Sequence, residues 1–305
     1  MLRRSLERNK YNGNSRHEEH QYLNLIIDIL NEGVMETGRN GNAKTVVGSA
    51  MHFSLEGGIW PLLTTKKVAW KTCAKELFWF IKGSTDNALL QEQNVKIWDG
   101  NASREYLDDI GLYDRAENDL GPIYGHQWRH FNAPYGTCKD NYESKGYDQL
   151  GYIISCLKNP NTRNSRRLVM SAWNPGQMGE MALPPCHVLC QFNVTNGDQL
   201  SCSLYQRSGD VGLGVPFNIA SYSLLTHLLA KHCGLIATDF YYHLGNCHIY
   251  DDHEEALAEQ VLRQPSPFPT LNIKALKENI EDYSLADLEV LNYVSHDPIK
   301  MEMRK

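Results

Sequence analysis

The sequence lacks most of the features that would assign a protein to a class by composition alone. Its 305 residues contain no apolar run that approaches the roughly 18 residues needed to cross a membrane. Positive charge is not in excess either, because 36 acidic residues outweigh 30 basic ones and leave a net charge of −6, which argues against general nucleic-acid binding. Linkers rich in Pro and Ser, internal repeats and breaks in composition are also lacking, so we expect residues 21–305 to form a single domain.

The eight cysteines follow neither metal-binding nor secretory spacing. They are scattered, mostly within apolar runs, and the pair Cys186 and Cys190 is not followed by a second pair at the spacing of a zinc site. We therefore expect free thiols rather than disulfides, a reducing compartment, and no metal. The cytoplasm fits this expectation best, with the nucleus and organelles left open.

The N-terminal 20 residues are polar and carry both signs of charge. Their basic residues resemble those of a transit peptide, but Glu7, Glu18 and Glu19 do not fit such a segment. We expect residues 1–20 to be a disordered polar tail.

Helical and strand-like segments alternate along the rest of the chain. Apolar residues recur at helical spacing over 22–32, 71–82 and 218–232, and each segment is followed closely by a glycine that can end a helix. Strand-like runs lie between residues 167 and 250. This pattern predicts an α/β (α+β) fold in which long helices pack on a mixed, largely antiparallel sheet.

One stretch combines a nucleophile with a strong turn signal. Cys186 follows two prolines and opens a strand-like run over 187–194, which reaches Asn196-Gly197 and returns as a second run over 200–206. The sequence therefore predicts a hairpin that begins at a cysteine and ends at an arginine.

The register of this hairpin decides what stands next to the cysteine. A two-residue turn pairs Thr195 with Asp198, and by the same count it pairs Cys186 with Arg207. A guanidinium at that distance favours the thiolate, the reactive form of cysteine. A register error of one residue would move one of the two side chains to the other face. We predict that Cys186 is a catalytic nucleophile with Arg207 beside it.

Two residues outside the hairpin could move protons. Glu76 shares a helical face with Cys73 and Phe80, so its carboxylate is either paired with a neighbouring helix or has a raised pKa in a pocket. Tyr124 lies between two glycines, where its hydroxyl could relay protons or simply bond to the backbone.

Several polar residues could bind a nucleotide. Arg166 and Arg167 precede a strand-like run and should point to opposite sides of it, where their guanidinium groups suit either a phosphate or solvent. Arg39 opens a polar loop that fits either an anion site or a solvated turn. Asn218 could cap the helix that follows or read a ring through its paired donor and acceptor. Trp98, near a turn, could mark a core edge or a ligand platform.

Together these motifs resemble the thymidylate synthase family from about residue 21 to residue 303. The resemblance rests on Pro184-Pro185-Cys186-His187, Gln206-Arg207-Ser208-Gly209-Asp210, Leu213-Gly214-Val215-Pro216-Phe217-Asn218-Ile219-Ala220-Ser221-Tyr222 and His248-x-Tyr250. It implies an obligate homodimer with sheets stacked back to back, which converts dUMP and the co-substrate 5,10-methylenetetrahydrofolate to dTMP and dihydrofolate.

The resemblance also implies roles for single residues. Cys186 would add to carbon 6 of uracil, which divides a difficult substitution into easier steps. The implied catalytic residues are Cys186, Glu76, Tyr124, Arg207, Asp210 and Asn218. The implied dUMP contacts are Arg39, His187, Gln206, Arg207, Ser208, Asn218, Ser221, His248 and Tyr250, with Arg166 and Arg167 of the partner subunit. The implied folate contacts are Ile97, Trp98, Asn101, Asp210, Leu213, Gly214, Phe217 and Met303.

Three departures from the family pattern stand out. The loop after Arg39 is about one residue shorter than expected and lacks the usual glycine and threonine residues. Asn246 replaces an aspartate, and Asp251-Asp252-His253 replaces a stretch in which Asn-His is usual. The last residues are Met301-Glu302-Met303-Arg304-Lys305 in place of a small apolar pair. This tail normally folds over bound ligands and excludes water, so two cations could weaken closure or change the outcome of the reaction.

Two alternatives remain beside dUMP methylation. A deoxynucleotide hydroxymethylase would share the early steps and add water, not hydride, although a cytosine-specific version would need an acid in place of Asn218. A weakly active relative that binds nucleotides or RNA would not need Cys186, Arg207, Glu76 and Tyr124 together, and the chain lacks patches of interleaved aromatic and basic residues.

Overall fold

The structure is a computed structural model that describes residues 17–38 and 40–304. Its α-helices are α2 (His20–Glu32), α3 (Trp70–Ile81), α4 (Ala88–Gln91), α5 (Asp99–Ala102), α6 (Arg104–Asp109), α7 (Tyr124–His130), α8 (Gln149–Lys158), α9 (Gly214–Cys233) and α10 (Glu254–Gln260). Its strands are β1 (Val34–Gly38), β2 (Gly41–Ser54), β3 (Val169–Ser171), β4 (His187–Thr195), β5 (Gln199–Asp210), β6 (Ile236–Tyr250), β7 (Thr270–Ile273) and β8 (Leu288–Leu291). Its 3₁₀ helices are η1 (Glu56–Gly58), η2 (Pro175–Glu180), η3 (Asp251–His253), η4 (Ile280–Asp282) and η5 (Leu285–Asp287).

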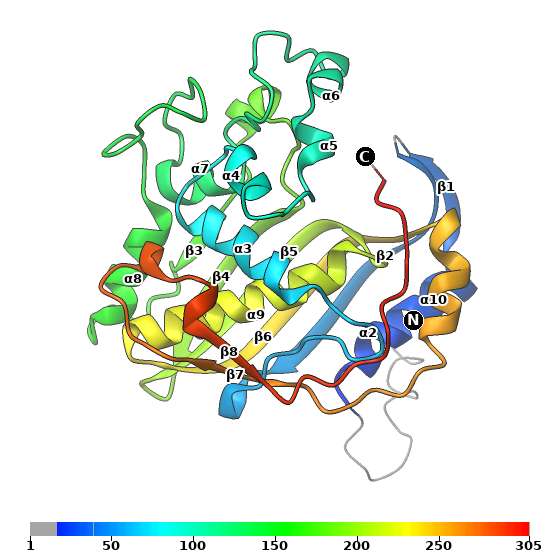
Figure 1. The fold of residues 1–305 in the computed structure, drawn as a ribbon. Coiled ribbons are helices and arrows are strands. Elements are labelled where there is room, and N and C mark those ends of the chain that lie inside the picture. Colours follow the sequence, from blue (N-terminus) through cyan, green and yellow to red (C-terminus); the bar gives the residue numbers. More distant parts are fainter. Residues whose placement is uncertain (1–16, 39, 305) are drawn as a thin grey trace.

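A mixed sheet with the strand order β1-β2-β6-β5-β4-β3 forms the centre of the fold (Figure 1). β5 and β6 run parallel, and the other neighbouring strands of this sheet run antiparallel. β7 and β8 form a separate antiparallel pair. The predicted fold, helices packed on a mixed and largely antiparallel sheet, is confirmed.

The long helix α9 packs on β5 and β6 and is buried along most of its length. It ends at Gly234, whose φ of 68° is the left-handed conformation that favours glycine, so the predicted stop is confirmed. The helix begins at Gly214, four residues before the predicted start at 218. Pro216 does not prevent this, because a proline is tolerated in the first turn, where its missing N–H has no partner within the helix.

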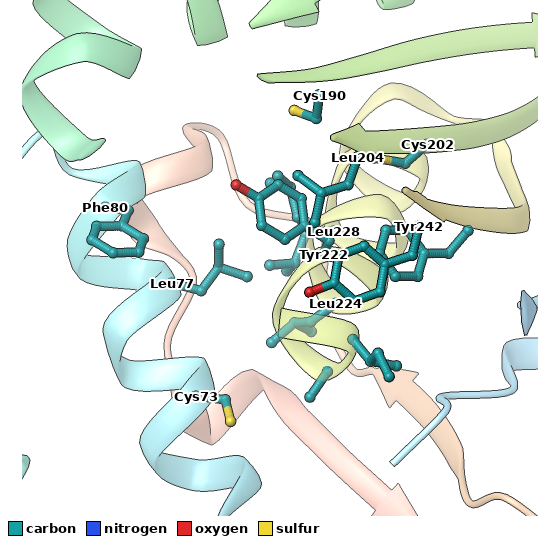
Figure 2. Close-up of a cluster of buried hydrophobic side chains, with 14 of the residues drawn as sticks. Cys73, Leu77, Phe80, Cys190, Cys202, Leu204, Tyr222, Leu224, Leu228 and Tyr242 are labelled. Carbon is teal, nitrogen blue, oxygen red and sulfur yellow. The ribbon is translucent and has the colours of Figure 1, made fainter. Parts of the chain in front are cut away.

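Side chains of α3, α9 and the sheet meet in one apolar core (Figure 2). In this view Leu77 of α3 points toward α9, and Tyr222 and Leu224 of α9 lie beside Leu204 and Tyr242 of the sheet. All five are nearly or fully buried. This packing fixes the middle of α9 against the middle of β5 and β6, and thereby positions the ends of these elements, where the candidate site residues lie.

The folded part of the chain begins earlier than the predicted boundary at residue 21. Residues 1–16 of the predicted tail lie outside the described residues, but Glu19 is fully buried. Its carboxylate accepts hydrogen bonds of 2.6–3.0 Å from the N–H and hydroxyl groups of Thr64 and Thr65. These bonds tie the start of α2 to the loop before α3.

The register of the β4–β5 hairpin differs from the prediction by one residue over most of its length. Thr195 pairs with Gln199, and not with Asp198, so the connection contains three residues. Asn196 and Gly197 both have positive φ, 49° and 89°, which reverses the chain within this loop. The prediction of a two-residue turn is therefore wrong, because Asp198 belongs to the loop and not to the strand.

A β-bulge between His187 and Leu189 absorbs this difference before the hairpin reaches the cysteine. His187 pairs with Gln206, and the N–H of Arg207 donates to the carbonyl of Cys186 at 3.0 Å. Cys186 and Arg207 are thus neighbours as predicted, although the bulge, and not the assumed turn, produces this pairing.

No helix among residues 17–38 and 40–304 is both long and apolar enough to cross a membrane. No disulfide joins any of the eight cysteines, all of which lie in the described part of the chain.

Candidate active site

Cys186 lies immediately before β4, and its backbone is fixed from two sides. Its N–H donates to the hydroxyl of Tyr124 at 2.7 Å, and its carbonyl accepts the N–H of Arg207 at 3.0 Å. Cys138 is the other cysteine that is partly exposed, whereas the remaining six are buried. Burial and the charge of Asp119 raise the pKa of Cys138 to about 12, which suppresses its thiolate. Cys186 is therefore the best placed nucleophile.

Arg207 supports the turn that carries this cysteine. Its Nε donates to the carbonyl of Pro185 and its Nη2 to the carbonyl of Pro184, each at 3.0 Å. The guanidinium also stacks over the ring of Trp173, with its carbon 5.7 Å from the ring centroid. Arg207 thus holds the residues that precede Cys186 in place. That it also favours the thiolate stays a prediction.

Glu76 projects from α3, and the indole N–H of Trp98 donates to its Oε1 at 2.7 Å. Burial raises the pKa of this carboxyl from 4.5 to about 7, and the Trp98 hydrogen bond opposes the rise. The residue nevertheless keeps part of its surface accessible. Its partner is an indole and not a cation of a neighbouring helix, so Glu76 fits the predicted pocket acid or base better than a structural ion pair.

Tyr124 stands at the start of α7 inside an aromatic cage. Its ring centroid lies 4.9 Å from Phe80, 6.2 Å from Trp98 and 5.0 Å from His187. Burial and the nearby charge of Cys186 raise the pKa of Tyr124, so the hydroxyl keeps its proton. Because its oxygen already accepts the N–H of Cys186, the hydroxyl can donate that proton into the site.

Asn218 lies within α9 and does not cap it, because the helix begins at Gly214. Its Nδ2 is 2.7 Å from Nε2 of His187, and its Oδ1 lies 3.4 Å from the hydroxyl oxygen of Tyr242. Burial lowers the pKa of His187 to about 4, so its ring is neutral and Nε2 can accept from the Asn218 amide. The same Tyr242 hydroxyl donates to Oε1 of Gln206 at 2.6 Å. This network fixes the orientation of the Asn218 amide.

The ends of β5 and β6 bring a second group of polar residues together. The parallel register places Ser208 beside Asn246 and Asp210 beside His248. His248 and Tyr250 lie on the same side of β6, with ring centroids 5.2 Å apart, as their spacing predicted. Nδ1 of His248 is 2.9 Å from Oδ1 of Asn246, so the residue that departs from the family pattern positions this histidine.

Asp210 closes the loop between β5 and α9. Its Oδ1 accepts the N–H groups of Gly212 at 2.9 Å and Leu213 at 3.3 Å, which leaves Oδ2 for another partner. Lys66 is buried nearby and donates to the carbonyl of Gly212. Burial lowers the pKa of Lys66 to about 8, and the negative charge of Asp210 opposes that fall.

Comparison with known proteins shows the family to which the chain belongs. The family model of thymidylate synthase matches residues 20–305. The chain belongs to the thymidylate synthase family. It is 51% identical over 288 residues to the bifunctional dihydrofolate reductase-thymidylate synthase of Paramecium tetraurelia, which covers 94% of this chain and 61% of that protein. The proteins of the same name in Zea mays and Leishmania major are each 50% identical and cover 94% of this chain and 55% of their own length. The chain thus spans 55–61% of the length of these relatives.

The structure does not join all the residues that the thymidylate synthase resemblance implies. Arg166 and Arg167 are exposed and lie in a turn, because β3 begins only at Val169. The two arginines precede the strand as predicted, but local hydrogen bonds around Ser165 and Val169 hold a turn there, so the strand alternation that was expected to point them to opposite sides does not reach them. Arg39 lies outside the described residues.

The remaining implied folate and dUMP contacts lie on or beside α9, near α5 and in the C-terminal segment. Leu213, Gly214 and Phe217 lie at the start of α9 and are half-buried, and Ser221 is buried one turn further along. Ile97 and Asn101, near α5, are half-buried as well, whereas Met303 is exposed.

Two contributors were missed by the sequence prediction. Tyr242 shares the side of β6 that carries His248 and Tyr250, and this even spacing was the available signal. Lys66 reaches Gly212 across 146 residues of sequence, for which no local pattern exists. Among the described residues no group of three or more His, Cys, Asp and Glu side chains could hold a metal ion.

Proposed function

We propose that this chain methylates dUMP with 5,10-methylenetetrahydrofolate and releases dTMP and dihydrofolate. The observation that carries the proposal is the placement of Cys186, whose backbone is held by Tyr124 and Arg207 next to the oriented amide of Asn218. The family and the relatives support it. Residues 21–305 would form one catalytic domain, and the cytoplasm is the compartment we propose.

In the proposed reaction, the thiolate of Cys186 adds to carbon 6 of the uracil, and carbon 5 becomes a nucleophile that attacks the folate methylene. The proton on carbon 5 then leaves, and tetrahydrofolate departs as an exocyclic methylene forms. Hydride from that tetrahydrofolate reduces the methylene to a methyl group and leaves dihydrofolate. Cys186 is finally expelled, which restores the ring double bond of dTMP.

Glu76 and Tyr124 would manage the protons of these steps. A carboxyl whose pKa is about 7 can both accept and return a proton near neutral pH. Tyr124 stays protonated and would donate toward the ring, next to the cysteine that it positions. The aromatic cage around Tyr124 lowers the local polarity, which strengthens the hydrogen bond of Tyr124 to Cys186 and its proposed hydrogen bond to the ring.

For dUMP, Asn218 would donate to oxygen 4 and accept the proton of nitrogen 3, because its amide is held from both sides. Ser208, Arg207 and Arg39 would bind the phosphate, and His248 with Tyr250 would bind the 3′-hydroxyl. The other proposed dUMP contacts are His187, Gln206 and Ser221. The proposed folate contacts are Asp210 at the pterin, with Ile97, Trp98, Asn101, Leu213, Gly214, Phe217 and Met303.

We also propose a homodimer in which Arg166 and Arg167 of the partner subunit complete the phosphate site. Support comes from the open face of the sheet, opposite α9. Tyr205 and Tyr241 are 44% and 37% exposed there, on the adjacent strands β5 and β6. Exposed aromatic residues on a broad sheet face are typical of a surface that packs against another protein.

A product assay tests the proposed function. The protein is incubated with dUMP and 5,10-methylenetetrahydrofolate, and Cys186→Ala serves as the control. Dihydrofolate absorbance together with dTMP supports methylation. Tetrahydrofolate together with hydroxymethyl-dUMP would replace the proposal with the hydroxymethylase alternative, and binding of dUMP or RNA without any product would favour the regulatory one.

A further inference from the structure

Two of the departures from the family pattern, far apart in the sequence, lie against each other. Nη2 of Arg304 is 3.0 Å from a carboxylate oxygen of Asp251 and 3.0 Å from one of Asp252. The guanidinium carbon also lies 5.8 Å from the ring centroid of Tyr250. A side chain added at Gly41 would meet Nη1 of Arg304 at 3.2 Å, so the arginine also abuts the start of β2. Arg304 is thus anchored by charge, an aromatic ring and the backbone of β2.

The residues before Arg304 rest on the loop that Asp210 organises. The carbonyl of Glu302 is 2.8 Å from Nε2 of His253, which is fully buried. Nδ1 of His253 is 4.0 Å from Oδ1 of Asp210. The sulfur of Met301 lies 3.1 Å from the point that a Cβ on Gly212 would occupy. In Figure 1 the C-terminal segment, drawn in red, runs up toward the end of β1.

We propose that Arg304 is a positioning residue, and that its ion pairs with Asp251 and Asp252 latch residues 301–304 onto the folate side of the site. The role in folate use rests on the proposed function, whereas the latch itself does not. In the family pattern a small apolar pair stands where Arg304-Lys305 stands here. In this chain a charged pair therefore stands in place of an apolar pair, which makes the attachment of the tail to the site sensitive to salt.

Kinetics test the positioning role. Arg304→Ala should raise KM for 5,10-methylenetetrahydrofolate roughly two- to fivefold at low ionic strength, the size expected for loss of one exposed ion-pair cluster. KM for dUMP should change little, and Arg304→Lys should recover most of the loss because it keeps the charge. The difference between Arg304→Ala and the wild type should shrink as NaCl rises from about 0.05 M to about 0.5 M.

A mutant cycle tests whether the three side chains act together. The double variant Asp251→Asn/Asp252→Asn should show the same rise in folate KM as Arg304→Ala, and combining all three changes should add little. Lys277→Ala is the matched control, since it removes another ion pair, Lys277–Asp287 at 2.8 Å, outside the tail. Additive effects in the cycle would overturn the latch.

A protease assay tests the latch without any catalysis. Lys300 is exposed, so trypsin can cut the chain directly before the tail segment, and intact mass follows that cut. Arg304→Ala should be cut faster after Lys300 than the wild type or Lys277→Ala. Cutting at the wild-type rate would overturn the latch even if dTMP is formed. If Arg304→Ala is cut faster but the wild type forms no dTMP, the latch is supported and the proposed function is refuted.

Discussion

Cys186 differs from the other cysteines in its surroundings and not in its chemistry. Tyr124 and Arg207 fix its backbone, and the carbonyls of Pro184 and Pro185 are held by the same arginine. A nucleophile that must approach one ring carbon benefits from such restraint, because little freedom is left to lose when the adduct forms. The hydrogen bonds of Tyr124 and Arg207 therefore fix the position of the cysteine. The reactivity of its sulfur depends on the pocket around it.

Replacing Cys186 with Ala or Ser should lower dTMP formation by at least roughly 10³-fold, because the covalent step is lost. Binding of dUMP should remain measurable by calorimetry, since other residues contact the phosphate, sugar and ring. Cys138→Ala is the control for a general effect of thiol removal, because this cysteine is also partly exposed. Near wild-type turnover in Cys186→Ala would refute the covalent mechanism.

Glu76 should set the pH dependence of the reaction. Its pKa is raised by burial to about 7, so kcat/KM for dUMP should bend near that pH as the carboxyl titrates. The bend should disappear in Glu76→Gln, together with a large part of kcat. A profile that keeps the same bend in Glu76→Gln would assign the titration to another group.

The same carboxyl should also affect stability, with a defined sign. Unfolded Glu76 loses its proton near 4.5 and the folded residue near 7, so between these values the folded state holds the extra proton. Stability therefore falls as pH rises through this window and is constant above it. Glu76→Gln should remove this penalty and raise the free energy of unfolding at alkaline pH by up to about 3 kcal/mol, relative to the wild type. Urea unfolding at pH values on both sides of the window measures the difference.

The positions of single residues could be predicted where a local sequence pattern marks them. Cys186, Asn218 and the His248–Tyr250 pair carry such signals in one hairpin, one helix and one strand. For Tyr242 the even spacing with His248 and Tyr250 gives only the side of β6. It does not tell this tyrosine from a core residue until the partners of its hydroxyl are known. Those partners, Gln206 and Asn218, come from two other elements.

At the scale of elements, the β4–β5 hairpin shows how a correct neighbour can follow from an incorrect register. The Asn196-Gly197 turn was visible in the sequence, but the third loop residue was not, because Asp198 fits a loop and a strand end equally well. The bulge at Val188 was also hidden, since an apolar residue there suits either face. Local sequence predicts strands and turns, whereas bulges follow from packing between elements.

The junction of α2 with the loop before α3 gives a prediction at this scale. Glu19→Ala would leave the buried N–H groups of Thr64 and Thr65 and the hydroxyl of Thr65 without their acceptor. We expect the free energy of unfolding to fall by roughly 2–4 kcal/mol, the cost of several unsatisfied donors. Glu19→Gln keeps one acceptor oxygen and should lose less. Urea midpoints measure both variants, and equal stability of Glu19→Ala and wild type would contradict the proposed anchoring.

At the scale of the whole molecule, the helices, sheet and family could be predicted because they rest on periodicity and dense motifs. The contact between Arg304 and Asp251 could not be predicted, because it joins residues that are 53 positions apart in the sequence and meet only in the folded chain. The proposed dimer surface could not be predicted either, because the exposed positions on β5 and β6 form one face only when the two strands are paired. Tyr205 lies beside His243, and Ser203 lies beside Tyr241.

If this face pairs two copies, Tyr205→Asp should shift the protein toward monomers in light scattering, because burying a carboxylate without a partner is costly. The active sites should then also fail, since each would lack the partner's Arg166 and Arg167. Mixing two inactive dimers tests that dependence directly. One carries Cys186→Ala, and the other carries Arg166→Ala with Arg167→Ala.

When the two variants are unfolded and refolded together, random pairing makes half of the dimers mixed. In each mixed dimer, one of the two sites has both an intact Cys186 and the partner's arginines. Activity should therefore recover to about one quarter of the wild type. The separately refolded parents serve as controls and should stay inactive. Native mass spectrometry can verify that mixed dimers form. Mixed dimers that recover no activity would show that the arginines act within their own subunit.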